Sequence, residues 1–195
     1  MGLEELVERV KKYQIKDDFR DEVVGLRCCE LALEALKTGN YGVGALLLDA
    51  EGNTLIEERN QVFAEHFCSS GHAEMRLIDT FEEKYLHNCA VDQLKLVVSL
   101  EPCPMCLSRL LLSGIGIVKY MVDDPVGGMV NKMDDMPPAW KNLASMQTFF
   151  RAHISSELRQ LAKDLSQYGL STLRANLMNE RLAEPDSETF ELLPE

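Results

Sequence analysis

The chain has 195 residues, of which 46% are hydrophobic and 27% are charged, and its formal net charge is −12. This length is enough for one globular domain with a sizeable core, and no apolar run approaches the roughly 18 residues of a membrane-spanning helix. Nucleic-acid binding draws much of its affinity from Lys and Arg on phosphates. The acidic net charge therefore favours a small-molecule substrate and argues against a nucleic-acid partner.

The cysteines and the N-terminus point to a reducing, cytoplasmic setting. Residues 1–6 are acidic and lack the apolar segment of a secretory signal. The six cysteines have no spacing that resembles a disulfide framework. They are Cys28, Cys29, Cys68, Cys89, Cys103 and Cys106.

The first half of the chain predicts helices, a hairpin and then alternating helices and strands. Apolar residues recur at helical spacing over 3–38, with Phe19, Val23 and Leu26 in the second, longer element. Two strand-like segments, 41–49 and 54–62, flank a turn and predict a hairpin. Further along, the pattern predicts a helix over 72–84, a strand over 94–100, a helix over 103–113 and a strand over 117–122. This order favours a mixed sheet with helices on both faces.

The second half begins with a loop and continues with helical spacing. Residues 123–138 are rich in Pro, Gly and acidic side chains, which is typical of a loop. Apolar residues at helical spacing follow, and Gly169 ends this pattern. A short helix is expected over 171–182, and residues 184–195 form an acidic tail. The spaced apolar residues are Leu143, Met146, Phe150, Ile154, Leu158, Leu161, Leu165 and Tyr168.

Two short segments carry the chemistry, and they provide three candidate zinc ligands. Cys103 and Cys106 are three residues apart, which places both sulfurs on one face of a helix. If the helix starts near Cys103, its positive end also favours the thiolate form. His72 supplies the third ligand. A zinc site with three protein ligands keeps its fourth position open for water, which is typical of catalytic zinc.

Glu74, two residues after His72, is the candidate proton carrier. The order His-x-Glu followed by Pro-Cys-x-x-Cys is typical of zinc deaminases. Zinc lowers the pKa of a bound water to roughly 7 in favourable cases, which makes hydroxide available at neutral pH. Hydrolytic deamination also needs protons at the ring nitrogen and at the departing amine. One carboxylate beside that water can take its proton and hand it on.

A structural zinc site is the alternative interpretation of the same ligands. Such a site normally has four protein ligands. In this sequence the fourth ligand would be Cys68, Cys89, His66 or His87, and Cys68 is the best placed because it lies four residues before His72.

Residues 71–75 (Gly-His-Ala-Glu-Met) and 99–106 (Ser-Leu-Glu-Pro-Cys-Pro-Met-Cys) resemble the cytidine deaminase superfamily. Within it they are similar to the branch of guanine deaminases, yeast-type cytosine deaminases and tRNA adenosine deaminases. The resemblance covers about residues 20–125. It implies an α/β fold, a three-layer α/β/α arrangement with a central mixed five-stranded sheet, to which this chain adds long C-terminal helices. It also implies a homodimer.

The resemblance further implies roles for individual residues. His72, Cys103 and Cys106 would hold Zn²⁺ as the cofactor, and Glu74 would be the catalytic proton shuttle. Asn60 would hydrogen-bond the substrate ring, since an amide can donate and accept at once, although a strand-end turn also explains an Asn here. The backbone N–H of Ala73 would lie beside the substrate.

The sequence therefore predicts one zinc-dependent deaminase domain over residues 1–183, with a catalytic core at about 20–125 and a helical part at about 139–183. The expected function is hydrolytic deamination of a free nucleobase or nucleoside of the guanine or cytosine type, with release of ammonia. A tRNA adenosine deaminase is the alternative, and an inactive zinc-binding scaffold subunit is the second alternative. Substrate contacts in RNA would gain from Lys and Arg, which this acidic chain lacks in any obvious run.

Overall fold

The computed structural model describes residues 2–87 and 89–182. No helix in this part of the chain combines the length and the apolar character needed to span a lipid bilayer. In chain order the elements are α1 (Leu3–Lys11), α2 (Glu22–Lys37), β1 (Gly44–Leu48), β2 (Thr54–Arg59), α3 (Ala73–Lys84), η1 (Val91–Gln93), β3 (Lys95–Val98), α4 (Pro104–Ser113), β4 (Ile117–Tyr120), η2 (Val130–Asp135), α5 (Pro138–Ala144), β5 (Thr148–Arg151), α6 (Ser156–Gln167) and α7 (Leu170–Leu182), where η1 and η2 are 3-10 helices.

The five strands form one mixed sheet in the order β2-β1-β3-β4-β5. β1 is antiparallel to both β2 and β3, so Ala45 lies opposite Val98. β3, β4 and β5 run parallel, with Lys95 opposite Ile117. The predicted hairpin and mixed sheet are thus confirmed, and β5 is the strand that the sequence pattern did not locate.

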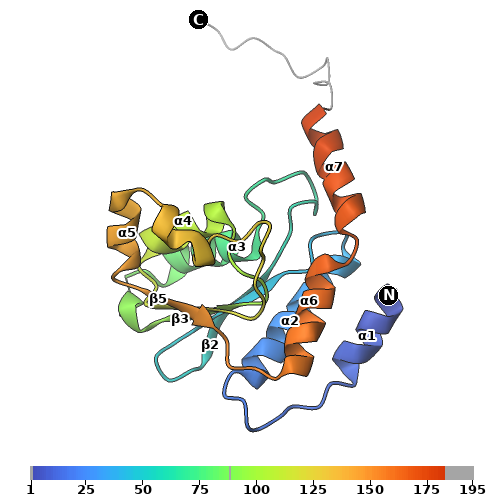
Figure 1. Ribbon diagram of the computed structural model, residues 1–195, viewed down its shortest axis with the longest axis horizontal. Coiled ribbons are helices and arrows are strands. Elements are labelled where there is room, and N and C mark those ends of the chain that lie inside the picture. The colour runs from blue at the N-terminus through green and yellow to red at the C-terminus, as the bar shows by residue number, and fades with distance from the viewer. Residues whose placement is uncertain (1, 88, 183–195) are drawn as a thin grey trace, which may run out of the picture.

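Helices cover both faces of this sheet, as Figure 1 shows with α2 and α6 on one side and α3 and α4 on the other. Successive residues of a strand point to opposite faces. Leu46 and Leu48 accordingly pack with α1, α2 and α6, whereas Ala45 and Leu47 pack with α3 and α4. The core therefore has two parts, one on each face, and the three-layer α/β/α prediction is confirmed.

Gly44 permits the close approach of α2 to β1. A Cβ atom at this position would lie 2.4 Å from the carbonyl oxygen of Cys28, closer than side chains come in folded proteins. The absence of a side chain lets α2 lie directly against the sheet, where Cys28 and Cys29 are fully buried.

The predicted helical region at 3–38 is two helices, and the intervening segment belongs to neither. Phe19 precedes α2, so its place in the predicted helix was wrong. The segment is tied down instead by side chains. The Tyr13 hydroxyl bonds to Glu22 and lies 2.8 Å from Oγ of Ser155, whose backbone N–H donates to Glu22 at 2.8 Å. These contacts join α1, α2 and the start of α6.

The predicted continuous helical pattern from Leu143 to Tyr168 was wrong, because β5 interrupts it between α5 and α6. Phe150 fits the helical spacing of the sequence, but in β5 Phe149 and Phe150 point to opposite faces of the sheet. Phe149 packs with the α3 and α4 core, and the ring of Phe150 lies 5.5 Å from Nζ of Lys119. Parallel pairing with β4 outweighs local helical preference here. The C-terminal part is therefore not wholly helical.

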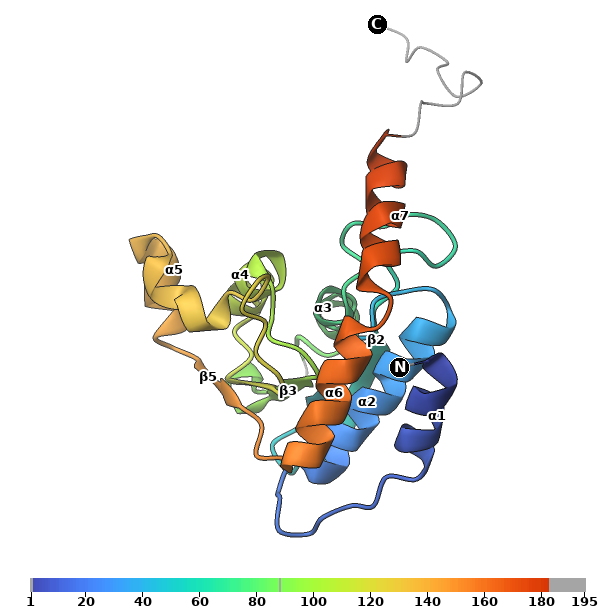
Figure 2. The ribbon, with the colours of Figure 1, turned by 45° about the vertical axis from the view of Figure 1, so that its right-hand side comes forward.

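The predicted loop at 123–138 contains η2, a short 3-10 helix. Gly169 has a φ of 67° and follows the end of α6, as predicted for a helix stop. After this turn α7 runs away from the sheet layers (Figure 2). The predicted acidic tail at 184–195 lies outside the described residues.

Candidate functional site

Two helices begin at candidate metal ligands. His72 is the N-cap of α3 and its carbonyl accepts the N–H of Arg76 at 3.0 Å. Cys103 is the N-cap of α4, where its carbonyl accepts the N–H of Leu107 at 2.8 Å and Pro104 occupies the first turn. Proline is favourable there because the first helical N–H needs no partner within the helix. The predicted starts of both helices are confirmed to within one residue.

The segment 61–71 places His72 by folding back on itself. The N–H of Gln61 donates to the carbonyl of Gly71 at 2.7 Å, and the N–H of Cys68 donates to Val62 at 2.8 Å. A Cβ atom on Gly71 would lie 2.8 Å from the carbonyl oxygen of Gln61, so this close approach needs glycine. The end of β2 and the start of α3 are therefore held side by side.

His72, Cys103 and Cys106 converge on one point. Nδ1 of His72 lies 3.7 Å from Sγ of Cys103 and 3.5 Å from Sγ of Cys106, and the three ligating atoms all lie within 4.8 Å of one another. One imidazole and two thiols suit Zn²⁺, which prefers nitrogen and sulfur ligands in tetrahedral geometry. The donor set and its spacing thus fit this metal.

The four residues considered as a fourth protein ligand lie outside this group in the described chain. Sγ of Cys68 is 3.4 Å from Oγ of Ser70, and the Cys89 thiol lies 3.2 Å from the carbonyl of Tyr85. His66 and His87 are not part of the group either. A three-ligand set favours a catalytic over a structural site.

The electrostatics of the three ligands favour binding of a cation. The hydrogen bond with Cys106, followed by that with His72, lowers the pKa of Cys103 to about 4. The same contact with Cys103, together with burial, raises the pKa of Cys106 well above its usual value. Burial alone would lower the pKa of His72, but its contact with Cys103 and the charge of Glu74 raise it. The pair of sulfurs thus shares one negative charge beside the imidazole.

Glu74 lies in the first turn of α3 and its side chain is almost fully buried, at 4% exposure. Burial raises its pKa, while the charge of His72 opposes that shift. A carboxyl group whose pKa moves toward neutrality exchanges protons more readily at physiological pH. The position and environment therefore suit a proton carrier beside the candidate metal ligands.

Glu74, His72 and Cys103 open into a cavity of about 630 Å³. This volume lies within the usual range for sites that bind small molecules. Its walls come from the segment before β1, the segment after β2 up to the start of α3, the start of α4 with the residues before it, the 123–128 segment, the end of α6, and α7. The remaining lining residues are Tyr41, Val43, Asn60, Val62, Ser69, Leu100, Glu101, Pro104, Met105, Asp124, Gly127, Ser166, Leu170, Arg174 and Leu177.

The two predicted substrate contacts occupy different environments. Asn60 follows β2, lines the cavity and is 2% exposed, and its Oδ1 accepts the N–H of Val62 at 3.2 Å. That hydrogen bond makes the strand-end turn, while the amide nitrogen of Asn60 is free of any such bond within the described chain. Ala73 begins α3 and its side chain packs in the core. Its N–H belongs to the first turn, where donors lack partners within the helix.

Glu101 is a buried carboxylate whose role the sequence did not reveal. One of its oxygens accepts the N–H of Asp124 and the other accepts the N–H of Asn131, each at 2.9 Å. Gly128 packs so closely that a Cβ atom there would lie 2.4 Å from the carboxyl carbon of Glu101. Glu101 thereby fastens one wall of the cavity. The sequence shows a Glu directly before Pro102, but no local pattern indicates that its carboxylate accepts hydrogen bonds from Asp124 and Asn131.

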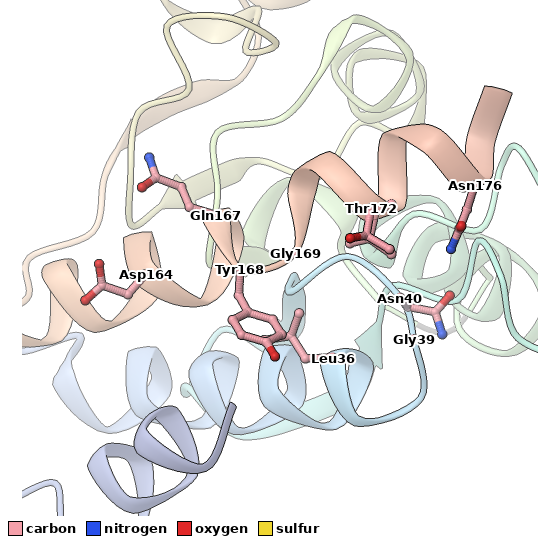
Figure 3. Close-up of a pocket in the computed structure, with 10 residues that line it drawn as sticks. Leu36, Gly39, Asn40, Asp164, Gln167, Tyr168, Gly169, Thr172 and Asn176 are labelled. Carbon is pink, nitrogen blue, oxygen red and sulfur yellow. The ribbon is translucent and has the colours of Figure 1, made fainter. Parts of the chain in front are cut away.

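A second hollow of about 560 Å³ lies between the end of α2 and the junction of α6 with α7 (Figure 3). Two of its polar side chains, Asp164 and Asn40, are already engaged. Asp164 accepts from Arg9 at 2.7 Å, and Asn40 donates to Thr38 and accepts from the N–H of Phe63. No metal-binding group was found here in the described residues. The chemistry is therefore concentrated in the first cavity.

Comparison with known proteins gives a family match over the core. The family described as the cytidine and deoxycytidylate deaminase zinc-binding region matches residues 20–122, slightly more than half of the chain. A protein of Deinococcus radiodurans named tRNA(Ile)-lysidine synthase is 33% identical over 110 residues, which are 54% of this chain and 18% of that protein.

Two further relatives extend this comparison. The tRNA-specific adenosine deaminase of Bacillus subtilis is 33% identical over 109 residues, covering 56% of this chain and 66% of that protein. This chain thus spans between 18% and 66% of the curated relatives that it matches. The structure of a guanine deaminase from Nitrosomonas europaea superimposes with a TM-score of 0.57 at 16% identity, covering 83% of this chain and 91% of that one. At this identity the likeness concerns the fold.

Proposed function

Because this chain belongs to the cytidine and deoxycytidylate deaminase family, we propose that it is a hydrolytic deaminase of a nucleobase ring or nucleoside. The reaction replaces an exocyclic amino group by oxygen and releases ammonia. The observation that carries this proposal is the convergence of His72, Cys103 and Cys106 within 4.8 Å, beside the buried Glu74 in one cavity.

His72, Cys103 and Cys106 would hold the zinc ion. Bound there, zinc would supply a water acidic enough to react near neutral pH. The helix N-terminal ends at His72 and Cys103 add partial positive charge, which helps to keep the sulfurs in their thiolate form. The three protein donors leave the fourth position to that water, whose oxygen would attack the amino-bearing carbon of the substrate.

Glu74 moves the protons. Its carboxylate would take one proton from the attacking water and deliver it to the ring nitrogen, and would then take the second proton from the newly added hydroxyl and deliver it to the departing amine, which leaves as ammonia. The same group is thus first a base and then an acid, and the raised pKa that burial gives Glu74 suits the second role. The apolar side chains of Val43, Val62 and Leu100 limit the access of water to this end of the cavity.

Asn60 and Ala73 would orient the ring. The side-chain amide nitrogen of Asn60 is available at the cavity wall and can donate to a ring acceptor. The N–H of Ala73 lies in the first turn of α3, next to His72, and can donate to a substrate oxygen or ring nitrogen. A ring fixed by these two donors would place its amino-bearing carbon within reach of the attacking water and of Glu74.

The experiment is ammonia release from a panel of free bases and nucleosides, with guanine, cytosine and adenine and their nucleosides. Each compound is tested with the wild-type protein and with Glu74→Gln at equal zinc content. We expect turnover of at least one compound, and a loss of about 10²- to 10⁴-fold in Glu74→Gln. Glu58→Gln is the control, because Glu58 pairs with Arg76 at 3.1 Å outside the cavity. Full activity of Glu74→Gln would contradict the proton-transfer role.

A tRNA adenosine deaminase is the second candidate, and it is favoured by the 33% identity to the Bacillus subtilis protein over 109 residues. The net charge of −12 argues against it, because binding of an RNA backbone relies on cations. An adenosine-containing anticodon stem added to the same panel separates the two. Turnover of the RNA alone would support this second candidate, and zinc binding without any turnover would support a scaffold subunit.

A homodimer is also part of the proposal, and light scattering after gel filtration tests it.

A further inference from the structure

α7 presents one face to the candidate active site. Leu170, Arg174 and Leu177 all line the cavity that contains Glu74. Their spacing of four and three residues places them on the same side of a helix. α7 lies beyond residues 20–122, so this wall belongs to a part of the chain outside the family match. Figure 2 shows α7 continuing from the end of α6, away from the sheet.

Tyr41 joins α7 to the rest of the cavity wall. Its hydroxyl lies 3.5 Å from the carbonyl of Leu173, the buried residue of α7. Tyr41 precedes β1 and lines the same cavity. Burial raises the pKa of Tyr41, and the positive charge of Arg174 opposes that rise, so the two side chains are electrostatic neighbours. Arg174 also lines the cavity, so both side chains belong to the same wall.

Arg174 differs from the arginines of this chain that pair with carboxylates. Other arginines donate to carboxylates, as Arg27 does to Glu57 and Arg109 does to Glu82. Arg174 makes no hydrogen bond or ion pair with any residue in the part of the chain that the structure describes. In a chain with a net charge of −12, carboxylates are abundant partners. A guanidinium without one at a cavity rim has its donors free for a ligand.

The carboxylates that line the same cavity do not neutralise Arg174. Both oxygens of Glu101 accept backbone N–H groups, from Asp124 and Asn131. Oδ1 of Asp124 accepts the N–H groups of Val126 and Gly127. The hydrogen bonds of Glu101 and Asp124 thus stabilise the segment 123–131. Glu74, the third carboxylate, lies beside the candidate metal ligands. Arg174 is thus the positively charged side chain that α7 contributes to the cavity, and these carboxylates do not pair with it in the described chain.

We propose that Arg174 is a specificity residue that binds an anionic group of the substrate, a phosphate or a carboxylate, on the side of the ring away from the metal ligands. This inference rests on the proposed deaminase function. A guanidinium can hold such a group with two parallel hydrogen bonds. Leu170 and Leu177 flank it and reduce local hydration, which strengthens the interaction. The substrate would thus be a heterocycle with a charged substituent rather than a bare base.

The test compares matched pairs of substrates that differ only in the anionic group. Cytidine is paired with its 5′-monophosphate, guanosine with its 5′-monophosphate, and cytosine with 5-carboxycytosine. Each is assayed with wild type, Arg174→Gln, Arg174→Lys and Arg181→Gln. The ratio of kcat/KM between the anionic and the neutral member should fall about tenfold to a hundredfold in Arg174→Gln, mainly through KM. Arg174→Lys should restore part of the ratio.

Arg181 provides the matched control, because it is a second exposed arginine of α7 that does not line the cavity. Arg181→Gln should leave the ratio unchanged. A loss confined to the phosphate pairs identifies phosphate as the recognised group, and a loss confined to the carboxylate pair identifies carboxylate. Turnover with an unchanged ratio in Arg174→Gln would overturn this inference and leave the deaminase function intact.

If no compound is turned over, the proposed function fails and binding decides the inference separately. Titration calorimetry of cytidine 5′-monophosphate and 5-carboxycytosine with zinc-loaded wild type and Arg174→Gln is then the measurement. About tenfold or greater weakening of either ligand in the variant supports anion binding at Arg174. If the wild type and Arg174→Gln bind each of the two ligands with equal affinity, the inference is overturned. Circular dichroism of both proteins establishes that the variant is folded.

Discussion

Residues 20–122 and residues 123–182 differ in how strongly their structure is determined locally. In the first region, α3, α4 and the four strands each have a signal in the adjacent sequence, such as Pro104 at the start of α4 and Gly114 at its end. In the second region, β5 exists because β4 offers it a parallel edge, and α7 meets the cavity because of the turn at Gly169. The candidate metal ligands therefore follow from local pattern, whereas the cavity walls from the second region follow from tertiary packing.

The largest effect is expected from breaking the ligand set in the first region. Cys103→Ala removes one of three converging donors. We expect it to lose tightly bound zinc and to have no detectable turnover, because two protein ligands seldom hold zinc. Elemental analysis after gel filtration measures the metal. Cys68→Ala is the control, since Cys68 lies near His72 in sequence but outside the ligand group, and it should retain one zinc per chain. Stoichiometric tight zinc in Cys103→Ala would mean a different ligand set.

A substitution of Glu101 tests whether the conformation of the segment 123–131 depends on a side chain of the first region. Glu101→Ala removes the acceptor for the N–H groups of Asp124 and Asn131 and leaves a space beside Gly128. We expect a loss of about 2 kcal/mol in the free energy of unfolding, together with a higher KM because Asp124 and Gly127 line the cavity. Urea unfolding and steady-state kinetics measure the two effects.

Glu83→Ala is the matched control for Glu101→Ala. Glu83 is an exposed carboxylate of α3, and its removal should change the free energy of unfolding by less than about 0.5 kcal/mol. Glu101→Gln keeps one acceptor oxygen and should fall between the two. A Glu101→Ala protein as stable as wild type would show that the 123–131 wall holds its conformation without this carboxylate.

The smallest effect is expected where α6 meets the first region. Tyr13 bonds to Glu22 and Ser155, so Tyr13→Phe should cost about 1 kcal/mol. Burial, with the Glu22 contact, raises the pKa of Tyr13 from 10.0 to about 12. The folded state therefore holds the phenol proton more tightly than the unfolded state. This contribution is complete below about pH 10 and is lost as the pH rises toward about 12.

Urea unfolding of wild type and Tyr13→Phe at a series of pH values measures this prediction. The difference in free energy between the two proteins should be constant at neutral pH and should shrink between about pH 10 and about pH 12. Parallel curves for the two proteins over that window would mean that Tyr13 does not titrate differently in the folded state.

Four strands of the sheet and the convergence of the three candidate metal ligands could be predicted from the sequence because short-range patterns determine both. β1 is buried along its whole length, and its apolar run is visible as Ala45, Leu46, Leu47 and Leu48. Cys103 and Cys106 are brought together by one helical turn. His72 needed only the start of a second helix on the same side of the sheet.

The C-terminal region could not be predicted in the same way, because its apolar residues are compatible with both the helical and the strand period. Phe149 and Phe150 are adjacent apolar residues, so they satisfy a helix and a strand equally in isolation. Ser155 carried a signal for the start of α6, since its Oγ accepts the N–H of Leu158, and that signal separates the strand from the helix. No sequence motif marks Arg174 as a functional residue. Its position at the cavity depends on the path of the chain after Gly169.

The separation of His72 from Cys103 along the chain has a thermodynamic consequence. A metal ion held by both residues closes a loop of 31 residues, and closing such a loop costs a flexible chain roughly 3 kcal/mol of entropy. The unfolded chain cannot offer the same convergent donors, so mass action makes the folded population grow with the concentration of free zinc. The cellular lifetime of this protein would then follow the supply of its metal as well as its own sequence.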